Sequence, residues 1–322
     1  MRTLLISALL VAGRIVAAEV PVAPVDDRAT LIVVAGAPGE EEFATVFDND
    51  MKTWAAVGLE ARAKSVAIGG DTSGAVSDHD RIKQALEAEP KEGAGELWLV
   101  LVGHGTFDGK EAKFNLRGPD VSASELAQWL QPFKRPIAVV DSSSASAPFL
   151  GKLAGPNRVV VSSTRSGFEQ NYARFGKYFA EAIADPKSDL DKDGQVSLLE
   201  AFLSASRRTT EFYKTEGRLA TEHALIDDNG DGLGTPAEWF RGLRATKQAK
   251  DGATLDGVRA RQFQLVRSAS EQQLSPVARA QRDALELEIA KLRDAKAKLP
   301  EEEYFRQLEA KLLELAAVYD GT

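Results

Sequence analysis

The sequence contains no cysteine, so disulfide bonds, thiolate metal sites and thiol nucleophiles are all excluded. Histidine is scarce, with three residues in 322, which leaves little from which to build a zinc site of clustered histidines. The glycine-rich turn at 36–39 lacks the lysine of a phosphate-binding loop and the spaced glycines of a dinucleotide site. No segment beyond the N-terminal region has the length of a membrane span. We therefore expect neither a nucleotide cofactor nor a membrane span.

Basic residues are fewer than acidic ones, 40 against 48, and the net charge is −8. A chain with a negative net charge is not expected to bind nucleic acid or an anionic membrane. The acid excess is concentrated in residues 189–200 and 227–238, which together supply −7 of the −8. Such local concentration favours bound cations in these two segments.

The N-terminus has the pattern of a secretory signal. Arg2 precedes an apolar run from Leu4 to Ala12, and small residues allow cleavage after Ala18. We interpret 1–18 as a signal peptide and 19–29, with two prolines, as an extended linker. The alternative is a buried first helix or a retained anchor. The signal interpretation predicts an exported protein, periplasmic or secreted.

Apolar strands alternate with amphipathic helices between residues 30 and 185. This order is typical of a parallel sheet that helices cover on both faces. The strands expected third and fourth end in His104 and in the polar run 141–144, which places both runs at the carboxyl edge of the sheet. Strands are expected at 31–36, 65–69, 96–103, 136–140 and 158–162, and helices at 41–60, from 78 or 80, and at 124–130.

The remaining chain is expected to be helical. Residues 172–248 suggest helix, acidic loop, helix, helix, acidic loop, helix, and 186–248 would form a paired calcium-binding region. Residues 249–322 end in a hairpin of two helices, which Leu299-Pro300 separates. Each helix has one apolar stripe, which packs on its partner helix or its own domain; the alternative is self-association through the hairpin. The stripes comprise Leu285, Ile289 and Leu292, then Leu308, Leu312, Leu315 and Tyr319.

Residues 189–200 have the residue pattern of an EF-hand calcium loop. Calcium prefers six to eight oxygen ligands, and the loop supplies them from positions 1, 3, 5, 7, 9 and 12. Gly194 at position 6 permits the sharp turn. The alternative is a solvated acidic turn. The predicted ligands are Asp189, Asp191, Asp193, Gln195 through its carbonyl, Ser197 through water, and Glu200 as a bidentate closing carboxylate.

Residues 227–238 repeat this pattern with two departures. Gly234 replaces the usual apolar residue at position 8, and Pro236 stands where the exit helix should begin. The alternative is a turn that holds no metal. The predicted ligands are Asp227, Asn229, Asp231, Leu233 through its carbonyl, and Glu238.

The two polar strand ends resemble a peptidase family. Leu99–Gly105 looks like the strand that ends in His-Gly in caspase, metacaspase and legumain-like peptidases, and Ile137–Ser143 looks like their next strand, which ends in Asp-Ser-Cys or a close variant. The resemblance covers roughly 30–185 and implies a caspase-like parallel sheet flanked by helices. It also implies that His104 is the general base or acid, and that backbone N–H groups of Gly105 and Ser143 form the oxyanion site.

Ser143 stands where this family has its nucleophilic cysteine. A thiol with a pKa of about 8.5 is partly ionised at neutral pH, whereas a serine hydroxyl needs a well-aligned base. We therefore expect a catalytically silent domain that binds a peptide or protein. One alternative is a calcium-dependent serine peptidase or hydrolase that uses Ser143 and His104. The other is a purely structural rim, in which the serines cap a helix.

Overall fold

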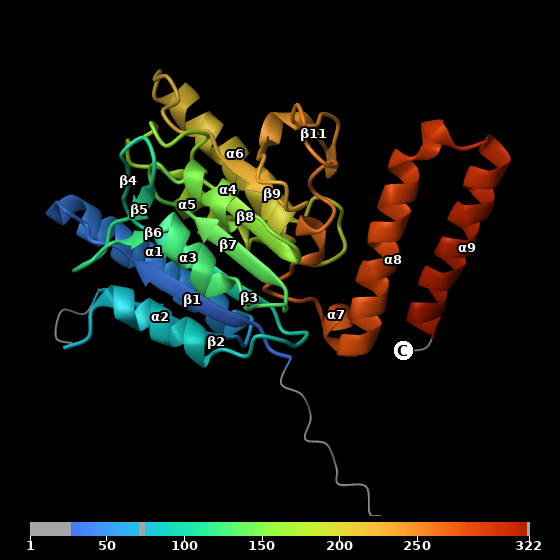
Figure 1. The fold of residues 1–322 in the computed structure, drawn as a ribbon, viewed down its shortest axis with the longest axis horizontal. Coiled ribbons are helices and arrows are strands. Elements are labelled where there is room, and N and C mark those ends of the chain that lie inside the picture. Colours follow the sequence, from blue (N-terminus) through green and yellow to red (C-terminus); the bar gives the residue numbers. More distant parts are fainter. Residues whose placement is uncertain (1–26, 71–74, 321–322) are drawn as a thin grey trace, which may run out of the picture.

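A sheet between two layers of helices forms the body of the computed structural model (Figure 1), which describes residues 27–70 and 75–320. The signal expected at 1–18 and most of the linker at 19–29 lie outside the described residues. Within the described ranges, no helix combines the length and the apolar character that crossing a membrane requires. The α/β class predicted from the sequence is confirmed.

The central sheet has seven strands in the described part of the chain, in the order β10-β9-β8-β7-β3-β1-β2. The five strands from β8 to β2 run parallel, and all five were predicted. Every residue of β1 and β3 is buried, because helices cover both faces of the sheet. The parallel strands are β1 (Thr30–Ala35), β2 (Lys64–Ile68), β3 (Leu97–Val102), β7 (Ile137–Asp141) and β8 (Arg158–Ser162).

The helices divide between the two faces of the sheet. On one face Trp54 of α1 stacks with Phe179 of α5 at 6.1 Å between ring centroids. On the other face Ile82 and Leu86 of α2, one helical turn apart, pack with residues of α3 and α4. The first layer contains α1 (Glu41–Glu60), α5 (Phe175–Ala182) and α6 (Leu198–Thr215), and the second α2 (Asp78–Ala88), α3 (Ala123–Leu130) and α4 (Ala147–Leu153).

Several short elements were not predicted. A small antiparallel sheet follows β3 and precedes α3, and a two-stranded ribbon follows the second acidic loop. Strands of two or three residues carry too little periodicity to be detected in a sequence. The first sheet consists of β4 (Gly105–Phe107), β5 (Ala112–Phe114) and β6 (Val121–Ser122), and the ribbon of β11 (Phe240–Arg241) and β12 (Arg244–Ala245).

The helices expected on both sides of the second acidic loop are absent, and that prediction was wrong. The loop instead connects β9 (Leu225–Asp227) to β10 (Thr235–Pro236), with only a 3-10 turn, η2 (Ala237–Trp239), after it. β9 pairs antiparallel with β8 and so extends the main sheet. The buried side chain of Ile226 provides the reason, since strand pairing buries it in the same core as α6. Part of 186–248 therefore belongs to the sheet whose other strands lie in 30–185.

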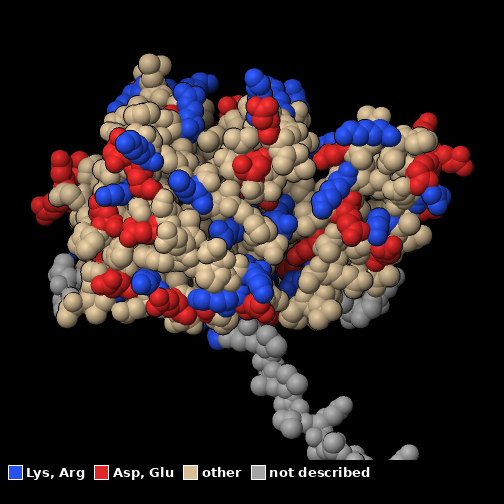
Figure 2. Space-filling view, in the orientation of Figure 1, with Lys and Arg blue, Asp and Glu red and all other residues tan. Residues whose placement is uncertain are grey.

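The C-terminal hairpin stands to one side of the body (Figure 1) and consists of α8 (Pro276–Asp294) and α9 (Glu301–Asp320), preceded by α7 (Ala269–Gln273). Ser275 caps α8 by accepting from the N–H of Ala278 at 3.1 Å. Leu285 and Ile289 are buried, whereas Leu312 remains 44% exposed. Figure 2 shows acidic and basic side chains interspersed over the visible face of body and hairpin. The apolar stripe is thus only partly covered by the described residues.

Candidate functional site

Three carboxylates of the first acidic loop converge at one point. The loop lies between η1 (Pro186–Ser188) and the start of α6, and Asp189, Asp191 and Asp193 each place one carboxylate oxygen within 4.8 Å of the others. These are the side chains predicted at positions 1, 3 and 5. Oxygen ligands gathered from alternate positions suit a hard divalent cation.

Backbone N–H groups hold Asp189 in place. Its Oδ1 accepts from the N–H of Lys192 at 2.6 Å, and its Oδ2 accepts from the N–H of Gly194 at 3.2 Å. Gly194 has φ of +90°, a conformation that a residue with a Cβ rarely adopts. The glycine predicted at position 6 therefore makes the turn that brings the loop back toward its first ligand.

Glu200, at position 12, folds back over the loop from the first turn of α6. Its Oε1 accepts from the N–H groups of Leu190 and Asp191 at 2.7 and 3.2 Å. Its Oε2 accepts from the N–H and the hydroxyl of Ser197 at 2.8 and 2.7 Å, which forms a capping box. One carboxylate thus joins positions 2, 3 and 9 of the loop, and it is only 2% exposed.

The carboxylates of the first loop have no basic side chain paired with them in the described part of the chain. Partial burial and the neighbouring Glu200 and Asp193 raise the pKa of Asp191, because each disfavours a further negative charge. No ion pair joins Asp189, Asp191, Asp193 or Glu200 to a basic side chain among the described residues. A bound cation would remove this repulsion.

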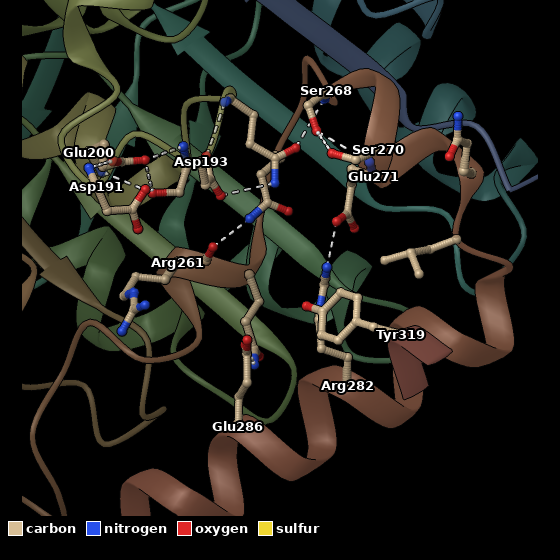
Figure 3. A pocket seen from close by; sticks show the side chains of 16 residues that line it. Asp191, Asp193, Glu200, Arg261, Ser268, Ser270, Glu271, Arg282, Glu286 and Tyr319 are labelled. Carbon is tan, nitrogen blue, oxygen red and sulfur yellow. Dashed lines mark hydrogen bonds and ion pairs between the residues drawn. The ribbon is translucent and has the colours of Figure 1, made fainter. Parts of the chain in front are cut away.

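A polar cavity of about 310 Å³ separates the first loop from the C-terminal hairpin (Figure 3). Asp191 and Asp193 lie on one side of it, and Glu271 and Arg282 form an ion pair of 2.5 Å on the other. The side chain of Gln195 connects the two sides, because its Oε1 accepts from the N–H of Ser268 at 3.0 Å while its Nε2 donates to Asp193 at 3.3 Å. The loop and the base of the hairpin are thus joined by one amide side chain.

The second loop repeats the backbone geometry of the first. Asp227 accepts from the N–H of Gly230 at 2.8 Å through Oδ1 and from the N–H of Gly232 at 2.6 Å through Oδ2. Asn229 accepts from the N–H of Asp231 at 2.8 Å, and Asp231 accepts from that of Leu233 at 2.8 Å. These three side chains and the carbonyl of Leu233 remain a predicted ligand set.

The predicted closing carboxylate of the second loop, Glu238, makes no hydrogen bond to the loop among the described residues. Glu238 lies on η2, is exposed, and forms no hydrogen bond or ion pair within the described part of the chain. Two carboxylates outside the predicted ligand set are buried here instead, Asp228 at position 2 of the loop and Asp256 beside the loop. Burial raises the pKa of Asp256 to about 7 and that of Asp227 to about 6, and neighbouring carboxylates contribute to both shifts.

The two strand ends that resemble a peptidase rim lie in contact. Gly105 donates its N–H to Ser144 Oγ at 3.1 Å, across the gap between the ends of β3 and β7. A Cβ added to Gly105 would lie 2.2 Å from the carbonyl oxygen of Ser144 and 3.0 Å from Ser143 Oγ. Only glycine fits this approach. The ends of these two neighbouring parallel strands therefore meet at one edge of the sheet, as the sequence predicts.

Ser143 is fully buried and engaged with Asp141. Its hydroxyl and its N–H donate to the same oxygen, Asp141 Oδ1, at 2.6 and 3.0 Å. Burial raises the pKa of Asp141 to about 7, although both hydrogen bonds act in the opposite direction. The two N–H groups expected to form an oxyanion site, those of Gly105 and Ser143, therefore both donate within the protein.

The ring of His104 faces aromatic residues, and no hydrogen bond joins it to Ser143 among the described contacts. Its centroid lies 4.6 Å from that of Phe43 and 6.3 Å from that of Tyr172. Burial lowers the pKa of His104, while a hydrogen bond to the carbonyl of Pro38 and the charge of Glu40 partly oppose this shift. Burial therefore favours the neutral imidazole, whose ring contacts Phe43 and Phe47 of α1.

No protein-family model matches this sequence. The comparison with curated proteins finds no match either. The chain is similar in structure to the Drosophila initiator caspase Dronc, with 13% identity, a TM-score of 0.42, and coverage of 65% of this chain and 82% of that one. It is also similar to caspase-1 from Spodoptera frugiperda, with 9% identity, a TM-score of 0.44, and coverage of 63% and 89%. These are likenesses of fold, and nothing about activity, metal binding or partners follows from them.

Proposed function

We propose that this chain is an exported calcium-binding protein whose α/β domain is catalytically silent. The observation that carries the calcium proposal is the convergence of Asp189, Asp191 and Asp193 within 4.8 Å, in a loop with glycine at position 6 and a buried glutamate at position 12. Carboxylate and carbonyl oxygens are the ligands that calcium prefers. Export rests on the signal pattern at 1–18 and would expose the protein to calcium outside the cytoplasm.

Calorimetric titration of chelator-treated protein with calcium tests this proposal. We expect saturable binding with a dissociation constant between about 10⁻⁷ and 10⁻³ M, the span from sensor loops to extracellular modules. Titration with magnesium is the control, since magnesium demands a smaller octahedral site and dehydrates reluctantly. The absence of saturable heat with calcium would refute the proposal.

We further propose that the α/β domain binds a peptide or protein. A cavity of about 380 Å³ opens beside the strand ends, and Phe43 and Tyr172, which contact His104, form part of its wall. Arg174 and Arg218 add positive charge to the wall, and Glu42 adds a negative charge. Aromatic and arginine side chains are the groups that dominate binding energy at protein interfaces.

The alternative, a serine hydrolase, requires Ser143 to be accessible and activated by a base. Ser143 is buried, and its hydroxyl donates to Asp141 rather than to His104. Both observations favour a catalytically silent domain. We expect a fluorophosphonate probe to leave the calcium-loaded protein unlabelled, as measured by intact mass. Labelling that disappears in both Ser143→Ala and His104→Ala would show instead that the pair reacts.

A further inference from the structure

We propose that Asp256, and not Glu238, is the carboxylate that closes the second calcium loop. This inference rests on the proposed calcium binding and assigns a ligand that lies outside the twelve-residue motif. It follows from comparing the two loops of this chain position by position, from the charge buried around the second loop, and from the way residues 253–256 are fixed to it.

The first seven positions of the two loops have the same hydrogen-bond pattern. The aspartate at position 1 accepts from the N–H groups of positions 4 and 6 in both, which are Lys192 and Gly194 in one loop and Gly230 and Gly232 in the other. The aspartate at position 5 accepts from the N–H of position 7 in both loops, at 3.0 Å and 2.8 Å. The two loops can therefore be compared at their closing positions as well.

In the first loop, Glu200 accepts from the N–H groups of positions 2 and 3 with one oxygen and from the hydroxyl at position 9 with the other. In the second loop these contacts belong to Asp256. Its Oδ1 accepts from the N–H groups of Asp228 and Asn229, positions 2 and 3, at 3.0 and 3.2 Å. Its Oδ2 accepts from the hydroxyl of Thr235, position 9, at 2.6 Å. Asp256 thus occupies the place of a closing carboxylate.

Two further hydrogen bonds join the second loop to residues 253 and 254, which lie just before Asp256 in the sequence. Asp231 Oδ2 accepts from the N–H of Ala253 at 2.8 Å, and Asn229 donates from Nδ2 to the carbonyl of Thr254 at 2.8 Å. Predicted ligands at positions 3 and 5 therefore fix the segment that delivers Asp256.

The charge around the loop calls for a cation. Asp227, Asp228 and Asp256 are 1%, 4% and 4% exposed, and none forms an ion pair with a basic side chain in the described part of the chain. The carboxyl group of Asp228 hydrogen-bonds to that of Asp256, and its two oxygens also accept from the N–H groups of Gly257 and Ala260. Buried carboxylates without a counterion are unfavourable, so a calcium ion between Asp227 and Asp256 would supply what the chain lacks.

The test compares two acid-to-amide variants, Asp256→Asn and Glu238→Gln, by calcium calorimetry on the full chain. We expect two calcium ions per wild-type chain, two in Glu238→Gln, and one in Asp256→Asn. The affinity of the remaining site in Asp256→Asn should equal that of the first site of the wild-type protein, which shows that the variant is folded. Asparagine retains an acceptor for Asp228 and Asn229 and a hydrogen-bonding group for Thr235, so the loop keeps its shape while losing one charge.

The inference is overturned if Glu238→Gln binds one calcium ion, or if Asp256→Asn still binds two. It is also overturned if the wild-type chain binds one ion that Asp191→Asn abolishes, since the second loop would then be empty while the proposed function stands. No calcium binding at all would refute both. Should Asp256→Asn fail to fold by circular dichroism, Glu238→Gln decides alone, because its exposed side chain has no structural contacts to lose.

Discussion

Replacing Asp191 with asparagine is expected to remove most of the calcium-dependent stability that the first loop provides. A site saturated at a hundred times its dissociation constant stabilises the folded protein by about 2.7 kcal/mol. Asp191→Asn deletes one charged ligand, and calcium affinity depends on the number of such ligands. The melting temperature in saturating calcium should therefore fall by on the order of 5 °C relative to the wild-type protein.

The metal-free variant is expected to behave differently. The N–H of Asp193 donates to the carboxylate of Asp191, a bond that asparagine can also accept, while burial and the charges of Glu200 and Asp193 disfavour the ionised carboxylate. Without calcium, Asp191→Asn should therefore melt at or slightly above the wild-type temperature. Glu309→Gln, an exposed substitution on α9, is the matched control and should leave both melts unchanged. A calcium-induced rise in Asp191→Asn as large as that of the wild-type protein would contradict the assignment of Asp191 as a ligand.

Replacing Asp141 with asparagine is expected to change how stability depends on pH. Burial raises the pKa of Asp141 to about 7, whereas an unfolded aspartate ionises near a pKa of about 3.9. Between these values the folded protein holds a proton that the unfolded chain has released. The free energy of unfolding therefore falls as pH rises through this window, by at most about 1.4 kcal/mol per pH unit, and levels off above pH 7.

Urea denaturation at intervals from pH 4 to 8, with chelator present, measures this effect. The difference in unfolding free energy between the wild-type protein and Asp141→Asn should be most favourable to the wild type at low pH and should decline toward pH 7. Other buried acids, such as Asp50, titrate in both proteins and cancel. In Ser143→Ala the loss of the hydroxyl bond to Asp141 should extend the decline to higher pH, since that bond favours the ionised form. Parallel curves for wild type and Asp141→Asn would show that Asp141 is ionised throughout.

The sequence was most informative where apolar residues follow a single helical or strand pattern over a long segment. The helix predicted at 41–60 has the same bounds in the structure, since its apolar residues recur at helical spacing and face one side of the sheet. The wholly apolar run of β3 predicted a central parallel strand, and β3 lies between β1 and β7. Motif spacing likewise predicted the carboxylates that converge in the first loop.

Features that depend on distant residues could not be predicted. The motif at 227–238 suggested helices on both sides, but pairing with β8 decides the structure of β9. Asp256 is separated from Asp228 by 28 residues, and no local pattern links them. The sequence also placed His104 and Ser143 at one rim without indicating their orientations. Those depend on Phe43, which contacts the imidazole, and on Asp141, which accepts from the hydroxyl.

The pairing of β9 with β8 has a practical consequence for anyone who shortens this chain. A fragment that ends at residue 185 keeps all five parallel strands but loses β9 and β10, and with them the neighbours of Val160, Val161 and Ser162. Unpaired N–H and C=O groups along such a border recruit strands from other molecules. The fragment would consequently aggregate, even though every residue of the peptidase-like rim is still present.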